Sequence, residues 1–321
     1  MFVRAVASVF AFWAVLSSGG DVFGQEYPSK TIRIIAASAG SSGDFAARLI
    51  AQGISGGLGQ QLIVENRGGS VAISGELVAK AAPDGYTLLF MPSSLWLLPF
   101  MQDNVPYDPV RDFAPITLSG RTPAILVVHP SLRVKSVKEL IALAKSRPGA
   151  LDYASASTGS ATHVASELLK SMAGVNIVRI PYKGTALALN GLLGGQTHLM
   201  FSTLAPALPH VKSGRLLALG ITSAEPSALA PGVPTMAAAG LPGFEATSTQ
   251  GMFAPARTPA SIVNRLNQEI VRFLARPEVK EKFFNVGTDV VASTPEQFAA
   301  AIKSEMTRLG KAITDAGMRA E

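Results

Sequence analysis

Apolar runs and amphipathic segments alternate along most of this chain. Several of the strand-like runs are continuously apolar, as expected for parallel strands that are covered on both faces. They lie at 31–37, 61–66, 86–91, 124–129, 151–155, 176–182, 197–202 and 216–222. Helix-like segments lie between and after them, at 44–55, 72–81, 136–146, 160–173, 185–194, 205–213, 259–275 and 295–316. The alternation predicts an α/β fold with parallel sheets.

Two stretches rich in Pro and Gly, at 104–115 and 229–259, interrupt this alternation. Such stretches are typical of connections rather than of regular elements. We therefore predict two lobes between which the chain crosses twice. The first lobe comprises residues 25–125 plus 250–321, and the second comprises residues 126–249.

The first residues follow a different pattern. Arg4 provides a short positive region, residues 5–16 are apolar, and residues 17–24 are mostly small. This predicts a secretory signal peptide over residues 1–24 with cleavage near Gln25, and hence an exported protein. A buried amphipathic helix is the alternative, but the segment has no polar face.

Composition narrows the classes of partner. The chain has 321 residues, of which 48% are hydrophobic and 16% are charged, and it contains no Cys. The formal net charge is +6, and the Lys and Arg residues are scattered rather than clustered. A nucleic-acid surface is therefore not expected, whereas a mild positive field favours anionic ligands.

Catalytic and cofactor motifs find no support in the sequence. There is no G-x-S-x-G elbow, and the four His, at positions 129, 163, 198 and 210, lack the spacing of metal ligands. The loop at 36–44 lacks the Lys of a P-loop and the glycine spacing of a dinucleotide fingerprint. No metal or cofactor is expected.

Two loops share one local pattern of strand, small hydroxyl-rich turn and helix. They are "AASAGSSGDFAAR" at 36–48 and "ASASTGSATH" at 154–163, one in each predicted lobe. The first N–H groups of a helix lack intrahelical acceptors and carry partial positive charge, which favours a carboxylate. Ordinary helix capping by Asp44, Ser160 and Thr162 is the alternative. Across a cleft, the two loops could hold the two ends of one small anion.

Three further side chains are candidates with open alternatives. Asp44 is expected to cap a helix with Arg48 as its partner, because a direct ligand role would require an amine or a bridging water. Lys183 precedes a helix that begins near Thr185, where it could neutralise a carboxylate or remain a solvated loop residue. Trp96 follows the third strand, where it could stack on a ligand or belong to the core.

Together these segments resemble the substrate-binding proteins of the tripartite tricarboxylate transporters, also called the Bug family. The resemblance covers about Glu26 to Ala316 and includes "GQQLIVENRGG", "VPYDPVRDFAPIT", "LDYASASTGSATHVASELLKSMAG" and "VRIPYKGTALALNGLLGGQ". It implies a two-lobed periplasmic binding protein of the type II-like fold, with a mostly parallel sheet flanked by helices in each lobe. It also implies hinge closure on a small carboxylate and delivery to a membrane permease of one large and one small subunit, without catalysis. We expect a monomer.

The resemblance and the loop pattern together define the candidate ligand-binding residues. They are Ser38, Gly40, Ser41, Ser42, Asp44, Ser93, Trp96, Ser157, Thr158, Gly159, Ser160, His163, Tyr182, Lys183, Ser202 and Thr203. In some members of the family, ordered waters bridge one carboxylate to the first loop.

The sequence departs from the family pattern at several of these positions. Ala36, Ser38 and Ala39 replace common prolines, and Ser41 and Ser42 replace common glycines. Ser202-Thr203 stands where Asp-Asn is frequent, and Ile73 and Leu98 stand where Asn is frequent. These departures predict a less polar pocket, suited to a dicarboxylate with an apolar or aromatic middle, such as terephthalate, rather than citrate or an amino acid. The alternatives are a sensory receptor for another organic anion and an exported enzyme on a similar fold.

Overall fold

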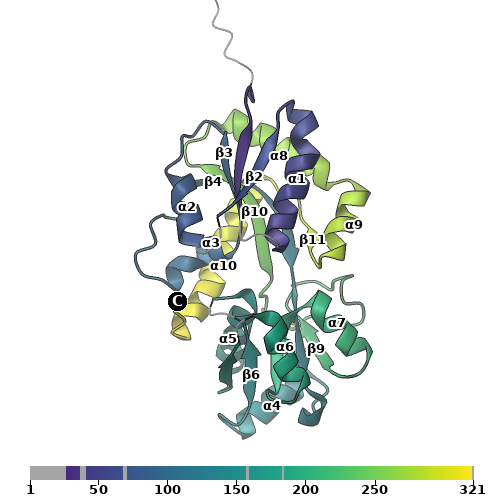
Figure 1. Ribbon diagram of the computed structural model, residues 1–321. Helices are drawn as coiled ribbons and strands as arrows, with labels where there is room; N and C mark the ends of the chain where they lie inside the picture. The colour runs from purple at the N-terminus through teal and green to yellow at the C-terminus, as the bar shows by residue number, and fades with distance from the viewer. Residues whose placement is uncertain (1–26, 37–40, 68–70, 157–158, 183, 320–321) are drawn as a thin grey trace, which may run out of the picture.

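The computed structural model describes residues 27–36, 41–67, 71–156, 159–182 and 184–319. The predicted signal peptide and its cleavage site lie outside this range. Figure 1 shows two α/β lobes, one above the other. The two-lobed fold predicted from the sequence is confirmed.

Six strands form the sheet of the first lobe, in the order β11-β4-β10-β3-β1-β2. The strands are β1 (Ile32–Ala36), β2 (Leu62–Asn66), β3 (Thr87–Pro92), β4 (Phe113–Thr122), β10 (Ser248–Pro255) and β11 (Asp289–Val290). Its helices are α1 (Ser42–Leu58), α2 (Val71–Ala79), α3 (Ser94–Leu97), α8 (Ala260–Leu274), α9 (Pro277–Asn285) and α10 (Pro295–Asp315). A short 3₁₀ turn, η1 (Leu98–Phe100), follows α3.

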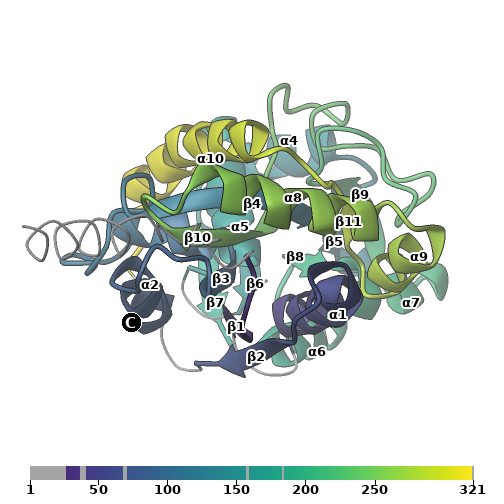
Figure 2. The ribbon, with the colours of Figure 1, turned by 90° about the horizontal axis from the view of Figure 1, so that it is seen from above.

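Five strands form the sheet of the second lobe, in the order β7-β6-β8-β5-β9. They are β5 (Ala124–Val128), β6 (Asp152–Ser155), β7 (Val178–Pro181), β8 (Leu199–Thr203) and β9 (Leu217–Ile221). The helices are α4 (Val137–Ser146), α5 (Ala161–Ala173), α6 (Thr185–Leu193) and α7 (Leu204–Lys212), with a 3₁₀ turn η2 (Pro130–Leu132). Figure 2 shows the molecule from above, with α8 and α10 side by side across the first lobe.

The sheets are mixed, which corrects the prediction that they are mostly parallel. β1 pairs with β2 and β3 in parallel, and β6 pairs in parallel with β7 and β8. β5 is the first strand after the chain enters the second lobe, and β10 is the first strand after it returns to the first lobe. Each runs antiparallel to both of its neighbours. A strand that enters directly from the other lobe needs no crossover helix, so it is free of the constraint that makes βαβ units parallel.

Both faces of the first sheet are buried, and side chains alternate between them along each strand. Ile34 and Met252 belong to a cluster with residues of α1 and α8, whereas Ile35 and Phe253 belong to a cluster with residues of α10. The second cluster continues into the other lobe, because α10 packs against both β4 and α5. The two lobes are therefore joined by packed apolar side chains as well as by the chain itself.

No helix within the described part of the chain is both long enough and apolar enough to span a membrane.

Candidate functional site

A cleft lies where the N-termini of α1 and α5 approach from opposite lobes. It has two adjoining compartments, which share Pro92, Ala161, Ala246 and Ser248. The amide compartment, about 190 Å³, includes Ser42 and Gly43 of α1, Ala161 and Thr162 of α5, and Gln250 of β10. The leucine compartment, about 230 Å³, includes Leu97, Ser160, Val164 and Leu309.

The loop before α1 presents the helix end to the cleft. Ser41 is the N-cap of α1, and its Oγ accepts a hydrogen bond from the Asp44 N–H at 3.1 Å. Ser41, Ser42 and Gly43 all line the amide compartment. Because the first N–H groups of a helix have no intrahelical acceptor, this turn offers backbone donors to a bound anion.

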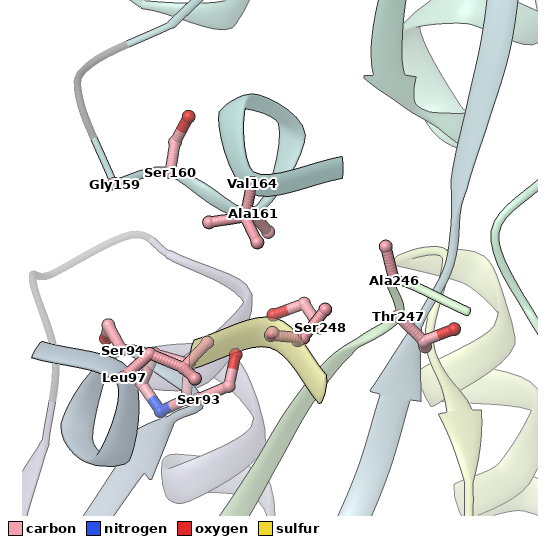
Figure 3. A pocket seen from close by; sticks show the side chains of 12 residues that line it. Ser93, Ser94, Leu97, Gly159, Ser160, Ala161, Val164, Ala246, Thr247 and Ser248 are labelled. Carbon is pink, nitrogen blue, oxygen red and sulfur yellow. The ribbon is translucent and has the colours of Figure 1, made fainter. Parts of the chain in front are cut away.

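The loop before α5 repeats this arrangement from the second lobe. Ser160 is the N-cap, and its Oγ accepts from the His163 N–H at 3.3 Å. The preceding Gly159 has φ +76°, and a Cβ there would lie 2.8 Å from the Met101 sulfur of the first lobe. Glycine is therefore needed both for the backbone conformation and for the close approach of the lobes. Figure 3 shows Ser160, Ala161 and Val164 opposite Ser93, Ser94 and Leu97, with Ser248 between them.

The described walls of both compartments carry no ionisable side chain. Asp44 is 7% exposed, and its Oδ1 accepts hydrogen bonds from Arg48 Nε at 2.9 Å and Asn66 Nδ2 at 2.8 Å. The prediction that Asp44 pairs with Arg48 is confirmed, but Ser41 rather than Asp44 caps the helix. Asp44 lies in the first turn, where its charge favours the helix N-terminus.

Trp96 does not line the cleft, so its predicted place as a ligand-stacking residue is wrong. The indole is 1% exposed and packs against Phe253 and Phe298. Its Nε1 donates to Glu305 Oε2 at 3.0 Å. A buried indole N–H requires an acceptor, and α10 provides one on the side of the sheet away from the amide compartment.

Three other candidates, His163, Tyr182 and Ser202, do not line either compartment. His163 is 3% exposed and its Nδ1 accepts from the Gly159 N–H at 3.2 Å, so it supports the turn from behind. Burial and the nearby Arg179 lower the pKa of His163 to about 4, which keeps the imidazole neutral. The Tyr182 hydroxyl lies 3.4 Å from Gln196 Oε1, and Ser202 is fully buried with its Oγ bonded to the Thr203 carbonyl.

Six predicted residues line the cleft: Ser41, Ser42, Ser93, Gly159, Ser160 and Thr203. Five others, Ser38, Gly40, Ser157, Thr158 and Lys183, lie outside the described residues.

Strands β4 and β10 supply wall residues that the sequence reasoning missed. Thr122 ends β4, and Ser248 and Gln250 belong to β10. The segment before Pro255 belongs to the Gly- and Pro-rich stretch at 229–259, which favours a connection. Its polar and apolar residues show no simple alternation that would indicate a strand. No local signal marked these residues as neighbours of the helix ends.

Two α/β lobes around a cleft between opposed helix ends define a solute-binding protein of the kind that closes on its ligand by a hinge. The chain belongs to the TctC family, the tripartite tricarboxylate transporter family receptors, whose family model matches residues 46–318. It is therefore a transport receptor and not an enzyme, and its family is one of periplasmic binding proteins. The predicted resemblance to the Bug family is confirmed.

A sequence relative and two solved structures match almost the whole chain. BugT of Bordetella pertussis is 35% identical over 324 residues, which cover 98% of each chain. R. palustris Rpa4515 with adipate is 32% identical, with a TM-score of 0.75, over 92% of this chain and 100% of that chain. MatC (Rpa3494) from Rhodopseudomonas palustris with bound malate is 29% identical, with a TM-score of 0.72, over 89% of this chain and 100% of that chain.

Replacing Asp44 with Asn should lower the free energy of unfolding by about 1 kcal/mol and leave ligand affinity unchanged. The variant keeps an Oδ1 acceptor but loses the charge that favours both Arg48 and the helix N-terminus. Denaturant unfolding measures the first effect and calorimetry the second. Asp315→Asn, in an exposed pair with Lys311, is the matched control and should change stability by less than about 0.5 kcal/mol. A large loss of affinity in Asp44→Asn alone would instead place the carboxylate at the ligand.

Proposed function

We propose that this protein captures a small dicarboxylate with an apolar or aromatic middle and delivers it to a two-subunit membrane permease. The observation that carries the proposal is the opposition of two helix N-termini, from different lobes, across a cleft whose described walls carry no ionisable side chain. Partial positive charge at each helix end stabilises a carboxylate there. A ligand that contacts both ends favours closure, because only the closed state makes both sets of contacts.

The leucine compartment supports an apolar ligand body. Leu97, Val164 and Leu309 line it, and Ser93 and Ser160 add hydroxyl groups. Apolar surface buried in this compartment stabilises the complex by roughly 25 cal/mol per Å². A ligand hydroxyl that packs against Leu97, Val164 and Leu309 would lack a partner, whereas an apolar ligand body carries no such cost.

The absence of ionisable groups from the described walls argues against amino acids. An ammonium group taken from water needs a paired anion or several acceptors. Asp44, the acidic residue nearest the α1 end of the cleft in sequence, is already bonded to Arg48 and Asn66. Neutral donors suit a ligand whose charged groups are both carboxylates.

Two relatives guide the choice of test ligands. One homologous structure holds adipate, a dicarboxylate with an apolar middle, and another holds malate, which carries a hydroxyl. The wall of the leucine compartment favours the first type for this chain. We extend the same reasoning to terephthalate, whose rigid ring also separates two carboxylates.

The proposed setting of this function is the periplasm. The apolar segment at 5–16 and the small residues that follow it support export with cleavage near Gln25. The mature receptor would act as a monomer and require neither cofactor nor nucleic acid.

Isothermal titration calorimetry of the purified protein tests the proposal. At least one of adipate, terephthalate and phthalate should bind 10-fold or more tightly than citrate or glutamate. The reason is that citrate and glutamate carry extra polar groups, and each such group left unsatisfied when buried costs about 1–3 kcal/mol. The bound ligand should be recovered chemically unchanged. Tight citrate binding with no response to the three apolar dicarboxylates would overturn the proposal.

A further inference from the structure

Gln250 contains a buried hydrogen-bond donor that the fold leaves unused. The side chain lines the amide compartment, and the residue is 5% exposed. Its Nε2 has no hydrogen-bond partner among the described residues. An unsatisfied buried donor costs about 1–3 kcal/mol, so such a group in a native protein requires an explanation.

The backbone of Gln250 is held on both sides. It pairs with Pro92 of β3 and Gly120 of β4, and the Ser119 hydroxyl donates to its carbonyl at 3.0 Å. These bonds fix the backbone of the strand, and with it the point from which the side chain extends into the compartment wall. Its amide can still turn, because rotation about the terminal χ3 of Gln has a broad, roughly twofold profile.

Gly120 leaves space for this amide. A Cβ at position 120 would lie 3.7 Å from Nε2, in ordinary contact distance. The same Cβ would lie 2.7 Å from the Thr288 methyl group, so a larger residue at position 120 would crowd Thr288 rather than the amide. Strand pairing therefore holds the Gln250 backbone at the wall of the amide compartment, and the amide lies beside Gly120.

We infer that Gln250 is a specificity-determining residue whose amide N–H donates to the carboxylate held between the N-termini of α1 and α5. The inference rests on the function proposed above. In the ligand-free protein the donor has no partner among the described residues, and a ligand oxygen in the amide compartment supplies one when the buried amide turns toward it. A ligand without an acceptor at this point leaves the donor unpaired and binds more weakly.

Two hydroxyl groups at the start of α5 are less suited to this discrimination. Thr162 and Ser160 interact with each other, with their oxygens 3.2 Å apart, and Ser160 also caps α5. Their hydroxyl groups therefore have partners with or without a ligand. Gln250 differs from these two because its Nε2 has no hydrogen-bond partner among the described residues.

Gln250→Met tests the inference, with adipate as the probe in calorimetry. The variant keeps a side chain of similar length but removes the donor, and adipate affinity should fall by 10-fold to 100-fold. Thermal unfolding of the ligand-free variant should occur at the wild-type temperature or above it, because an unpaired buried donor has been removed. A residue with a merely structural role would lower both stability and affinity.

Two further variants keep the result interpretable. Gln250→Leu removes the donor with a different shape and should show the same opposed changes in affinity and unfolding temperature. Gln196→Met removes an amide at an exposed position outside the cleft and should leave adipate affinity unchanged. If the wild-type protein binds adipate and both Gln250 variants bind it equally well, this inference is overturned and the proposed function stands. Wild-type protein that binds none of the dicarboxylates would overturn both.

Discussion

Replacing Ala161 with phenylalanine should abolish adipate binding without unfolding the protein. Ala161 is the first residue of α5, is exposed, and lines both compartments of the cleft. A phenyl ring at this position would occupy the space between the two helix ends and prevent the lobes from closing on a ligand. We expect a loss of more than 100-fold in affinity, which corresponds to about 3 kcal/mol.

The fold should tolerate this change, because surface substitutions away from packed features usually alter stability by less than about 0.5 kcal/mol. Ala260→Phe is the matched control, since Ala260 is also the exposed first residue of a helix but lies outside the cleft walls. The control should bind adipate as the parent does. If Ala161→Phe retains affinity within about threefold, the ligand does not lie between the helix ends.

The helix ends at Ser41 and Ser160 could be predicted because their signals are local. A strand followed by a small, hydroxyl-rich turn and an amphipathic run predicts an N-cap within a few residues. In each sheet, the helix that follows a parallel strand starts at that strand's carboxyl end, so α1 starts at the end of β1 and α5 at the end of β6. The sequence therefore indicates which turns can bind an anion without reference to how the lobes are arranged.

The strands that carry the rest of the cleft could not be predicted in this way. β10 lies in a stretch where Pro and Gly indicate a connection, and β4 follows the other such stretch. Their pairing depends on how the chain passes between lobes, which is a long-range property. Gln250 faces the cleft because β10 lies between β3 and β4, and no neighbour in sequence encodes that position.

Side-chain direction was a second source of error. Ile73 and Leu98 were expected to make the pocket less polar, yet neither lines a compartment: Ile73 is 59% exposed and Leu98 packs in the core. The apolar wall comes instead from Leu97, Val164 and Leu309. Leu97 ends α3 and lines the leucine compartment, whereas Leu98 begins the 3₁₀ turn η1 and does not, so the change of helix type within two residues decides which side chain reaches the cleft.

Glu305→Gln should remove a large part of the pH dependence of stability. Glu305 is 6% exposed and accepts hydrogen bonds from Trp96 Nε1 and Thr249 Oγ1, both at 3.0 Å. Burial raises the pKa of this carboxyl to about 7, although both donors and Arg308 act in the opposite direction. Glu245, which pairs with Arg308 at 2.6 Å, raises the pKa further.

The sign of the effect follows from proton binding. In the unfolded chain the carboxyl titrates near its ordinary value of 4.5, so between about pH 4.5 and 7 the folded state binds one proton more than the unfolded state. The free energy of unfolding therefore falls as pH rises through this window, by on the order of 3 kcal/mol. Below this window the Glu305 carboxyl is protonated in both the folded and the unfolded state. Above the window it is ionised in both states, and the free energy of unfolding is lowered by the full cost of burying the charge.

Glutamine preserves the shape and the bonds of the neutral form, since its oxygen can accept from Trp96 and its amide can donate to Thr249. At pH 5 the variant and the parent should have similar unfolding free energies, whereas at pH 8 the variant should be the more stable. Guanidinium unfolding at both pH values measures the difference. Glu296→Gln, at an exposed position on the same helix, should retain the parental pH profile. Parallel profiles for Glu305→Gln and the parent would show that Glu305 stays ionised, with the Trp96 and Thr249 donors outweighing its burial.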